Sequence, residues 1–118
     1  MRCTLTATAA SLAFVTATAA VTQVNIIDFA FSPQTVIIPK GEAVRWTNLE
    51  QVIHTATSDA GIWDSGDLKY RKSYSYKFRK TGIYTYYCKY YLFMRGTIHV
   101  TETAVAPSSL GRVKALFR

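Results

Sequence analysis

The stretch "TGIYTYYCKYYLFMRGTIHV", residues 81–100, decides the fold, because it predicts two β-strands and the loop that joins them. Tyr, Ile, Thr and Val dominate both ends of the stretch, and these residue types favour strands. The loop begins at Cys88 and ends at Met94. A thiol and a thioether at its two ends indicate either a soft metal site or a buried cysteine with a space-filling methionine. The stretch alone leaves both interpretations open.

Similar strand-length segments recur along the chain between turn signals, with spacings of about eight to twelve residues. Residues 42–48 alternate polar positions with Val44 and Trp46, which predicts a half-buried strand with Trp46 facing the core. The other predicted strands are residues 23–31, 35–39, 52–58, 73–78, 83–88 and 96–100, and a turn-rich loop is predicted at 59–68. Apart from a helix-like spacing of apolar residues at 110–117, no segment has a convincing helical period. The pattern therefore predicts an all-β antiparallel sandwich or barrel.

The two ends of the chain differ in composition from the middle. With 118 residues, the chain has room for one domain, which we place at residues 21–102. The first twenty residues, "MRCTLTATAASLAFVTATAA", predict a signal peptide at 1–20, cut after Ala19 or Ala20, although a retained N-terminal helix is the alternative. Cleavage removes Cys3, so Cys88 is then the only cysteine and no internal disulfide can form. Residues 103–118 are predicted to be a basic C-terminal tail.

The positive charge is concentrated in one stretch. The formal net charge is +7, and "LKYRKSYSYKFRK", residues 68–80, contains six Lys or Arg residues and no acid. Its aromatics and cations alternate with period two, as on a strand with one buried and one solvated face. A solvated face is therefore the first interpretation. A docking surface for an acidic partner or an anionic membrane comes next, and nucleic acid is disfavoured.

Three side chains are candidate metal ligands: His54, Cys88 and Met94. An imidazole, a thiolate and a thioether suit copper and not calcium or magnesium, which prefer oxygen donors. A trigonal His/His/Cys set with a weak axial Met is the pattern of a blue-copper electron-transfer centre. Each residue alone also fits an ordinary structural role. The aromatics expected in the core or on its faces are Trp46, Phe78, Tyr84, Tyr86 and Phe29. Trp63 either packs there or covers the site or a partner surface.

Motifs along most of the chain resemble the cupredoxins, in particular the small plastocyanin/amicyanin-like blue copper proteins. The matching segments are "FAFSP" at 29–33, "GEAVRWTN" at 41–48, "HTATSDAG" at 54–61, "WDSGDL" at 63–68, "TGIYTYYC" at 81–88 and "FMRGTIHV" at 93–100. The resemblance implies an eight-stranded Greek-key β-sandwich with one copper ion. It makes His54 the upstream histidine ligand, Cys88 the thiolate and Met94 the axial thioether. Asn48 is a candidate hydrogen-bonding support for that site.

One ligand of the family pattern is replaced in this chain. The family loop is C-x-x-H-P-x-M, and here Tyr91 stands at the histidine position and Leu92 at the proline position. The second histidine of the chain, His99, is expected to face solvent from the last strand. The remaining Cys/His/Met set is soft and three-coordinate, which favours Cu(I) over Cu(II). Tyr91 is only a doubtful ligand, because a phenol with a pKa near ~10 is neutral by default.

The sequence thus predicts a copper-binding electron-transfer protein, and not an enzyme, with a type 1-like mononuclear site altered by Tyr91. Two alternatives remain open: a Cu(I) carrier or holding module, and a metal-free interaction domain with a cupredoxin fold. The expected partner is a redox protein, with an acidic one fitting the basic stretch; no nucleic acid and no transmembrane segment are expected. We expect a monomer that is secreted or periplasmic after signal-peptide removal.

Overall fold

The computed structural model describes residues 20–102, which form eight strands and no helix. The strands are β1 (Val21–Ile27), β2 (Ala30–Ser32), β3 (Thr35–Pro39), β4 (Ala43–Asn48), β5 (Thr57–Ser58), β6 (Ser73–Lys77), β7 (Gly82–Tyr87) and β8 (Arg95–Thr101). The predicted tail and all but the last residue of the predicted signal peptide lie outside the described residues. Within residues 20–102, no helix is present that could cross a membrane.

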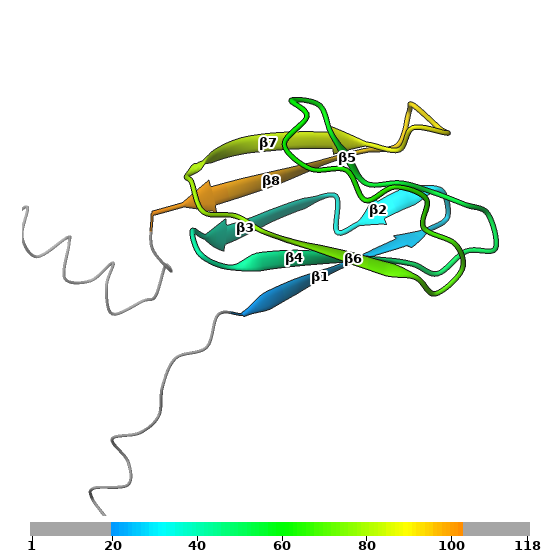
Figure 1. Ribbon diagram of the computed structural model, residues 1–118, viewed down its shortest axis with the longest axis horizontal. Helices are drawn as coiled ribbons and strands as arrows, with labels where there is room; N and C mark the ends of the chain where they lie inside the picture. The colour runs from blue at the N-terminus through cyan, green and yellow to red at the C-terminus, as the bar shows by residue number, and fades with distance from the viewer. Residues whose placement is uncertain (1–19, 103–118) are drawn as a thin grey trace, which may run out of the picture.

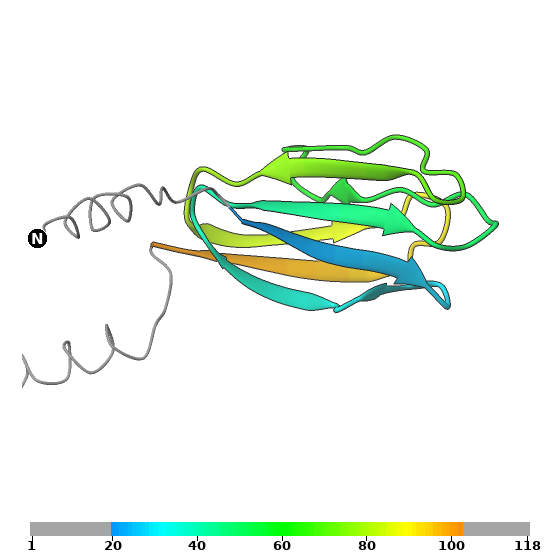
Figure 2. The same cartoon turned by 90° about the horizontal axis from the view of Figure 1, so that it is seen from below.

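The strands form two facing four-stranded sheets, with orders β2-β1-β4-β6 and β3-β8-β7-β5 (Figure 1, Figure 2). The predicted all-β sandwich and the strand number are confirmed. The sheets are mixed and not purely antiparallel, because β1 pairs with β4 and β3 with β8 in parallel. These parallel pairs arise because the chain crosses to the second sheet after β2 and crosses back after β3, so neighbouring strands are not always joined by a hairpin.

Two predicted strands have different limits in the structure. The predicted strand 23–31 is a hairpin, because Asp28 and Phe29 both have a φ of 55° and turn the chain between β1 and β2. Two successive positive φ angles are typical of a two-residue hairpin turn. The predicted strand 52–58 forms a strand only at Thr57–Ser58. His54 before it makes an isolated bridge to Leu68 instead.

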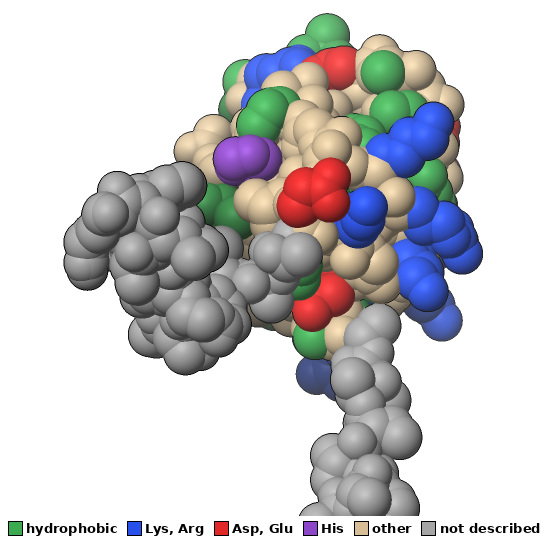
Figure 3. Space-filling model, turned by 90° about the vertical axis from the view of Figure 1, so that its left-hand side faces the viewer, with side chains coloured by type: hydrophobic (Ala, Val, Ile, Leu, Met, Phe, Trp, Pro, Cys, Tyr) green, Lys and Arg blue, Asp and Glu red, His purple; other side chains and the backbone are tan. Residues whose placement is uncertain are grey.

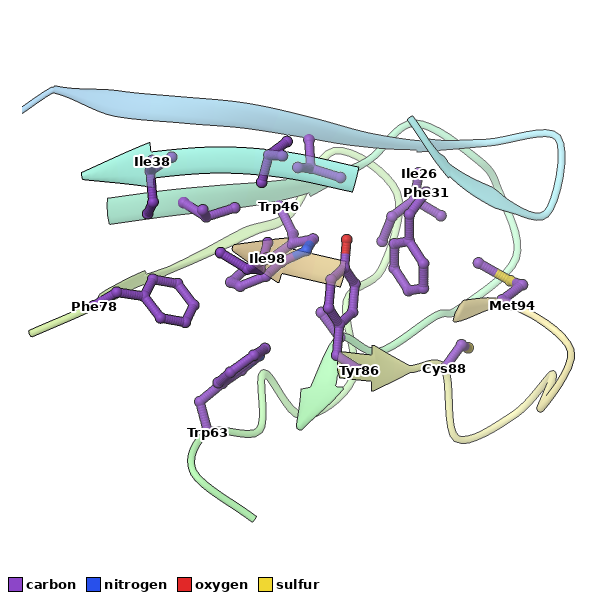
Figure 4. Packing of buried hydrophobic residues seen from close by; sticks show 14 of the residues in the cluster. Ile26, Phe31, Ile38, Trp46, Trp63, Phe78, Tyr86, Cys88, Met94 and Ile98 are labelled. Carbon is purple, nitrogen blue, oxygen red and sulfur yellow. The ribbon is translucent and has the colours of Figure 1, made fainter. Parts of the chain in front are cut away.

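The core lies between the sheets and is rich in aromatic rings (Figure 4). Trp46 stacks on Trp63 with ring centroids 5.5 Å apart, and Trp63 stacks on Tyr76 at 5.4 Å. Tyr86 meets Trp46 edge to face at 5.3 Å. Trp63 comes from the turn-rich loop but is buried in this cluster, so of its two expected positions it takes the core and not the metal site. Phe78 is also buried there, as expected.

The loops that follow β1, β4 and β7 gather at one end of the sandwich, opposite the end where the described chain begins and stops (Figure 1). His54, Cys88 and Met94 lie at this loop end and are all buried. His99 belongs to β8 and pairs with Ile37 and Ile83 on the outer face of its sheet, where it is half-buried. The structure therefore keeps the second histidine away from the candidate site.

Candidate metal centre

His54 is held in place by its backbone. Its N–H donates to the Leu68 carbonyl at 3.1 Å, and its carbonyl accepts from the Leu68 N–H at 2.7 Å. These two bonds form the isolated bridge, and they leave the imidazole fully buried beneath the loops. A polar ring buried in this way requires partners for both nitrogens.

Cys88 and Met94 are brought together by a tight loop. Cys88 directly follows β7, and its N–H donates to the Met94 carbonyl at 3.1 Å. The Met94 N–H donates to the Tyr91 carbonyl at 2.8 Å, which closes the turn inside the loop. Both side chains are buried at the same end of the core, beside Phe31 (Figure 4). The loop thus presents two sulfur atoms from positions that a few backbone bonds fix.

The imidazole and the thiol meet directly. His54 Nδ1 lies 3.6 Å from Cys88 Sγ, although the two residues are 34 positions apart. The backbone N–H of Thr55 donates to the same sulfur at 3.4 Å. The donor atoms at this point, an imidazole nitrogen, a cysteine sulfur and a nearby thioether, are of the types that copper prefers.

Glu50 orients the imidazole from its other side. Its carboxylate lies 2.7 Å from His54 Nε2, so a proton on Nε2 satisfies this contact and leaves the Nδ1 lone pair facing Cys88. The Phe29 N–H donates to the same carboxylate at 3.2 Å. A carboxylate that accepts a hydrogen bond from the second ring nitrogen is the usual support of a metal-binding histidine. Sequence reasoning did not single out Glu50, because only the turn between residues 50 and 54 brings the two side chains together.

Asn48 ties the segments of the site to one another. Its buried Nδ2 donates to the carbonyls of Val52 and Leu68, both at 2.7 Å, and its Oδ1 accepts from the Glu50 N–H at 2.8 Å. Every hydrogen-bonding atom of the amide therefore has a partner, as a buried amide requires. Asn48 thus fixes the turn that carries Glu50 and His54.

Tyr91 covers the imidazole. Its ring lies 5.3 Å from the His54 ring and 4.9 Å edge to face from Phe29, and Phe29 meets His54 at 5.3 Å. Within residues 20–102, no side chain or backbone group hydrogen-bonds the Tyr91 hydroxyl. Phe29 was expected in the core or on a sheet face, and it instead completes this aromatic cover. Phe29 has a positive φ of 55°, which is unusual for a phenylalanine.

Three acids of the turn-rich loop contact the loop from Cys88 to Met94, which we call the metal loop, and the residue that follows it. Asp64 pairs with Lys89 at 2.5 Å, Asp67 accepts from the Tyr90 hydroxyl at 2.7 Å, and Asp59 pairs with Arg95. The Lys89 hydrogen bond is the main reason why the pKa of Asp64 is lowered. The Thr85 hydroxyl, followed by Arg95, lowers the pKa of Asp59. These three carboxylates therefore connect the turn-rich loop to residues in and beside the loop that follows β7.

Of the sequence-predicted residues, the structure brings His54, Cys88, Met94 and Tyr91 to one place. Among the described residues, no three His, Cys, Asp or Glu side chains form a group that could hold a metal ion. Met94 and Tyr91 are not among these residue types, and they contribute two of the four side chains gathered at the candidate site. A hollow of about 150 Å³ reaches Met94 from the surface between Phe29 and Phe93.

The sequence also matches a described family. The profile of "Copper binding proteins, plastocyanin/azurin family" matches residues 18–101. The chain belongs to this family. Cupredoxins are in general copper-binding electron-transfer proteins and not enzymes, so the prediction of a copper cofactor is confirmed at the level of the family.

Individual relatives agree with this assignment. Amicyanin-alpha of Methylorubrum extorquens is 34% identical over 84 residues, which are 67% of this chain and 71% of that protein. A Cu(I) structure of amicyanin with one methionine replaced by glutamine has a TM-score of 0.65 and 26% identity, and covers 68% of this chain and 81% of its own. A purple cupredoxin from Nitrosopumilus maritimus has a TM-score of 0.64 and 26% identity, covering 68% and 99%.

Proposed function

We propose that this cupredoxin binds one copper ion through His54 Nδ1, Cys88 Sγ and the Met94 thioether, and that it transfers single electrons to or from a redox partner protein. The observation that carries the proposal is the 3.6 Å contact between Nδ1 and Sγ, both buried. A bare imidazole nitrogen and a thiol sulfur in contact, with a methionine at the same end of the core, form a donor set with the softness that copper requires.

The residues around the donors prepare them for a metal. Glu50 holds the His54 ring through Nε2, the Thr55 N–H donates to Cys88 Sγ, and Asn48 keeps the turn in position. Tyr91 and Phe29 exclude water from the imidazole. When bound, copper supplies the one-electron change between Cu(I) and Cu(II), and the protein supplies fixed donors that need little rearrangement.

A Cu(I) carrier or holding module is the second candidate, and Tyr91 favours it. The ring that replaces the second histidine packs on Phe29 and His54 and is not held by any described hydrogen-bond partner. Three soft donors without a second imidazole favour Cu(I). We therefore keep Tyr91 outside the ligand set in both candidates.

Copper titration separates the candidates. The purified protein is titrated with Cu(II) and, separately, with Cu(I), while visible absorption and bound metal are recorded. An intense thiolate-to-copper band that cycles with oxidation and reduction supports electron transfer. Tight Cu(I) uptake without a stable Cu(II) colour supports the carrier. Absence of binding in both states, with wild type and Cys88→Ser indistinguishable, leaves a metal-free interaction domain.

The composition of the first twenty residues and the basic stretch bear on where the protein acts and on its partner. We propose export to the periplasm or the exterior with removal of the signal peptide, a monomeric state, and a redox partner with an acidic surface. Mass spectrometry of the exported protein is expected to give a chain that starts at residue 20 or 21. Sedimentation is expected to give the mass of one chain, and a dimer mass contradicts the monomer.

A further inference from the structure

Six exposed cations flank one edge strand of the sandwich, and we call them the basic band. β6 is the last strand of its sheet and pairs with β4 alone among the described strands. Three of the cations precede β6, one ends it and two follow it. They are Lys69, Arg71, Lys72, Lys77, Arg79 and Lys80, and all are exposed. Figure 3 shows Lys and Arg side chains gathered along one side of the molecule.

The acids of the chain do not neutralise the basic band. All seven Asp and Glu residues lie within the described range. Their ion pairs with lysine or arginine go to Lys40, Lys89 and Arg95, which lie outside the band. Among the described residues, no carboxylate lies within ion-pair distance of a band cation. Uncompensated cations along about 17 Å of strand create a positive field that attracts an acidic surface.

A pocket opens at the far end of the band. It has a volume of about 300 Å³ and lies between the two sheets. Its lining residues are Ile62, Tyr76, Phe78, Arg79, Lys80 and Tyr84. Aromatic and aliphatic side chains thus adjoin two band cations. Such a mixture of aromatic residues, arginine and a concave apolar surface is typical of the centre of a protein–protein interface.

The other end of the band adjoins the candidate metal centre. The Arg71 N–H donates to the Asn48 carbonyl at 2.6 Å, and the Asn48 N–H donates to the Lys72 carbonyl at 3.0 Å. Leu68, which precedes the band, forms the backbone bridge to His54. A partner on the band therefore lies next to the segment that positions the histidine ligand.

We propose that the basic band docks the acidic face of a partner protein, with the pocket beside Arg79 and Lys80 receiving an apolar side chain of that partner. The inference rests on the proposed function only in taking the partner to be a redox protein, because the binding itself uses no copper. A protein fits better than a membrane, because the most exposed apolar side chains at the loop end, Leu92 at 66% and Phe93 at 71%, lie on the metal loop and not in the band.

The test maps binding of poly-L-glutamate, used as the acidic probe, to metal-free ¹⁵N-labelled protein by NMR. At about 0.01 M salt, amide shifts are expected at residues 69–72 and 77–80 and around the pocket, and they shrink at about 0.15 M. Lys72→Gln/Lys77→Gln/Lys80→Gln is expected to weaken binding at least about fivefold. The matched control, Lys40→Gln/Lys89→Gln/Arg95→Gln, removes the same charge and is expected to weaken it less than about twofold.

Equal weakening by the two triple variants overturns the proposal, because net charge alone then explains binding. Shifts confined to β3 and β8 overturn it as well. The third contrary result is binding of phosphatidylserine vesicles or single-stranded DNA to the band at concentrations where poly-L-glutamate does not bind. The partner is then a membrane or a nucleic acid and not an acidic protein. Each result is obtained without copper, so it is independent of the copper titration that tests the proposed function.

Discussion

Tyr91 stands where the family pattern has its second histidine. It stands between Cys88 and Met94, and its ring packs on the ring of the proposed ligand His54 at 5.3 Å. Tyr91→His places a second imidazole there, and we expect Cu(II) affinity to rise on the order of tenfold to a hundredfold, the range that supporting groups contribute at metal sites. Competition titration with a Cu(II) chelator measures the change, and a stronger thiolate-to-copper band is expected with it.

Tyr91→Phe is the matched control, because it keeps the ring that covers His54 and removes only the phenol oxygen. We expect it to bind copper as tightly as the wild type. A loss of Cu(II) binding in Tyr91→Phe contradicts the assignment of Tyr91 as a cover and makes its oxygen a ligand. Failure of Tyr91→His to bind any copper contradicts the proposed loop geometry.

Glu50 fixes the His54 ring through the 2.7 Å contact with Nε2. We expect Glu50→Ala to lower copper affinity about tenfold to a hundredfold, because the imidazole loses the group that selects its tautomer. Glu50→Gln keeps an acceptor oxygen and is expected to lose less. Isothermal calorimetry with Cu(I) measures both. The control Glu42→Ala removes an acid without a described side-chain partner, and an equal loss there contradicts the role of Glu50.

At the residue scale, the sequence indicates the candidate donors and Asn48, but neither Glu50 nor the Thr55 N–H. Cys88 and Met94 stand out because both lie in one short loop that keeps the family spacing. Glu50 does not stand out, because an acid in a loop is common and its contact with His54 exists only after the turn anchored by Asn48 has formed. The Thr55 N–H that donates to Cys88 Sγ belongs to the backbone, so no residue type indicates it.

At the element scale, strands with one buried face are predictable and irregular segments are not. β4 alternates buried and exposed side chains as its sequence indicates. The turn at Asp28 and Phe29 was not predicted, because neither residue is glycine and a positive φ is rare for phenylalanine. Residues 52–56 have the composition of a strand. Their backbone instead bonds to the facing loop, as where the Ala56 N–H donates to Ser65 Oγ at 2.8 Å.

Gly96 is required where β7 and β8 pair. It lies opposite Tyr86, and a Cβ at this position would be 2.3 Å from Tyr86 Cζ, much closer than two carbon atoms can approach. The Tyr86 ring is fully buried and cannot move aside freely. We expect Gly96→Ala to lower the free energy of unfolding by about 3 kcal/mol, the upper end for overpacking a core. Urea denaturation measures the loss.

Two further variants test whether the contact with the Tyr86 ring causes the loss of stability in Gly96→Ala. Thr97→Ala changes the neighbouring position of β8, whose side chain faces the other side of the sheet, and is expected to cost less than about 1 kcal/mol. Tyr86→Leu/Gly96→Ala replaces the ring that occupies the space, so the two substitutions are expected to be non-additive, with the double variant more stable than the sum of the single effects. Strict additivity contradicts the clash as the cause.

At the scale of the whole molecule, one aromatic core supports both the candidate metal centre and the basic band. The stacked rings of Trp46, Trp63 and Tyr76 fill the space between the sheets. The metal loop lies at one end of the sandwich, and the basic band follows its edge at β6.

The core contains three buried polar atoms without hydrogen-bond partners among the described residues: Nε1 of Trp46, Nε1 of Trp63 and Oη of Tyr86. These atoms reduce stability, because burial removes them from water.

The Tyr86 hydroxyl makes the stability of the whole fold sensitive to alkaline pH. Burial raises its pKa well above the usual value, and the nearby Trp46 indole N–H offsets only part of that rise without reaching hydrogen-bond geometry. In the unfolded chain the phenol ionises near pH ~10, while the folded state keeps it protonated. The unfolded state then binds fewer protons, so stability is complete below pH ~10 and falls as pH rises above it.

We therefore expect the wild type to lose roughly 1 kcal/mol of unfolding free energy from Tyr86 between about pH 10 and 11. Tyr86→Phe removes the ionisable oxygen and is expected to have a shallower alkaline slope, while at pH ~8 it is at least as stable, because the unpartnered hydroxyl is gone. Urea unfolding across this range measures both. The pKa values of Tyr74 and Tyr90 are also raised, so these residues affect the alkaline slope of both proteins. Only the difference in slope between the wild type and Tyr86→Phe therefore reports on Tyr86. Parallel curves contradict the prediction and place the alkaline sensitivity elsewhere.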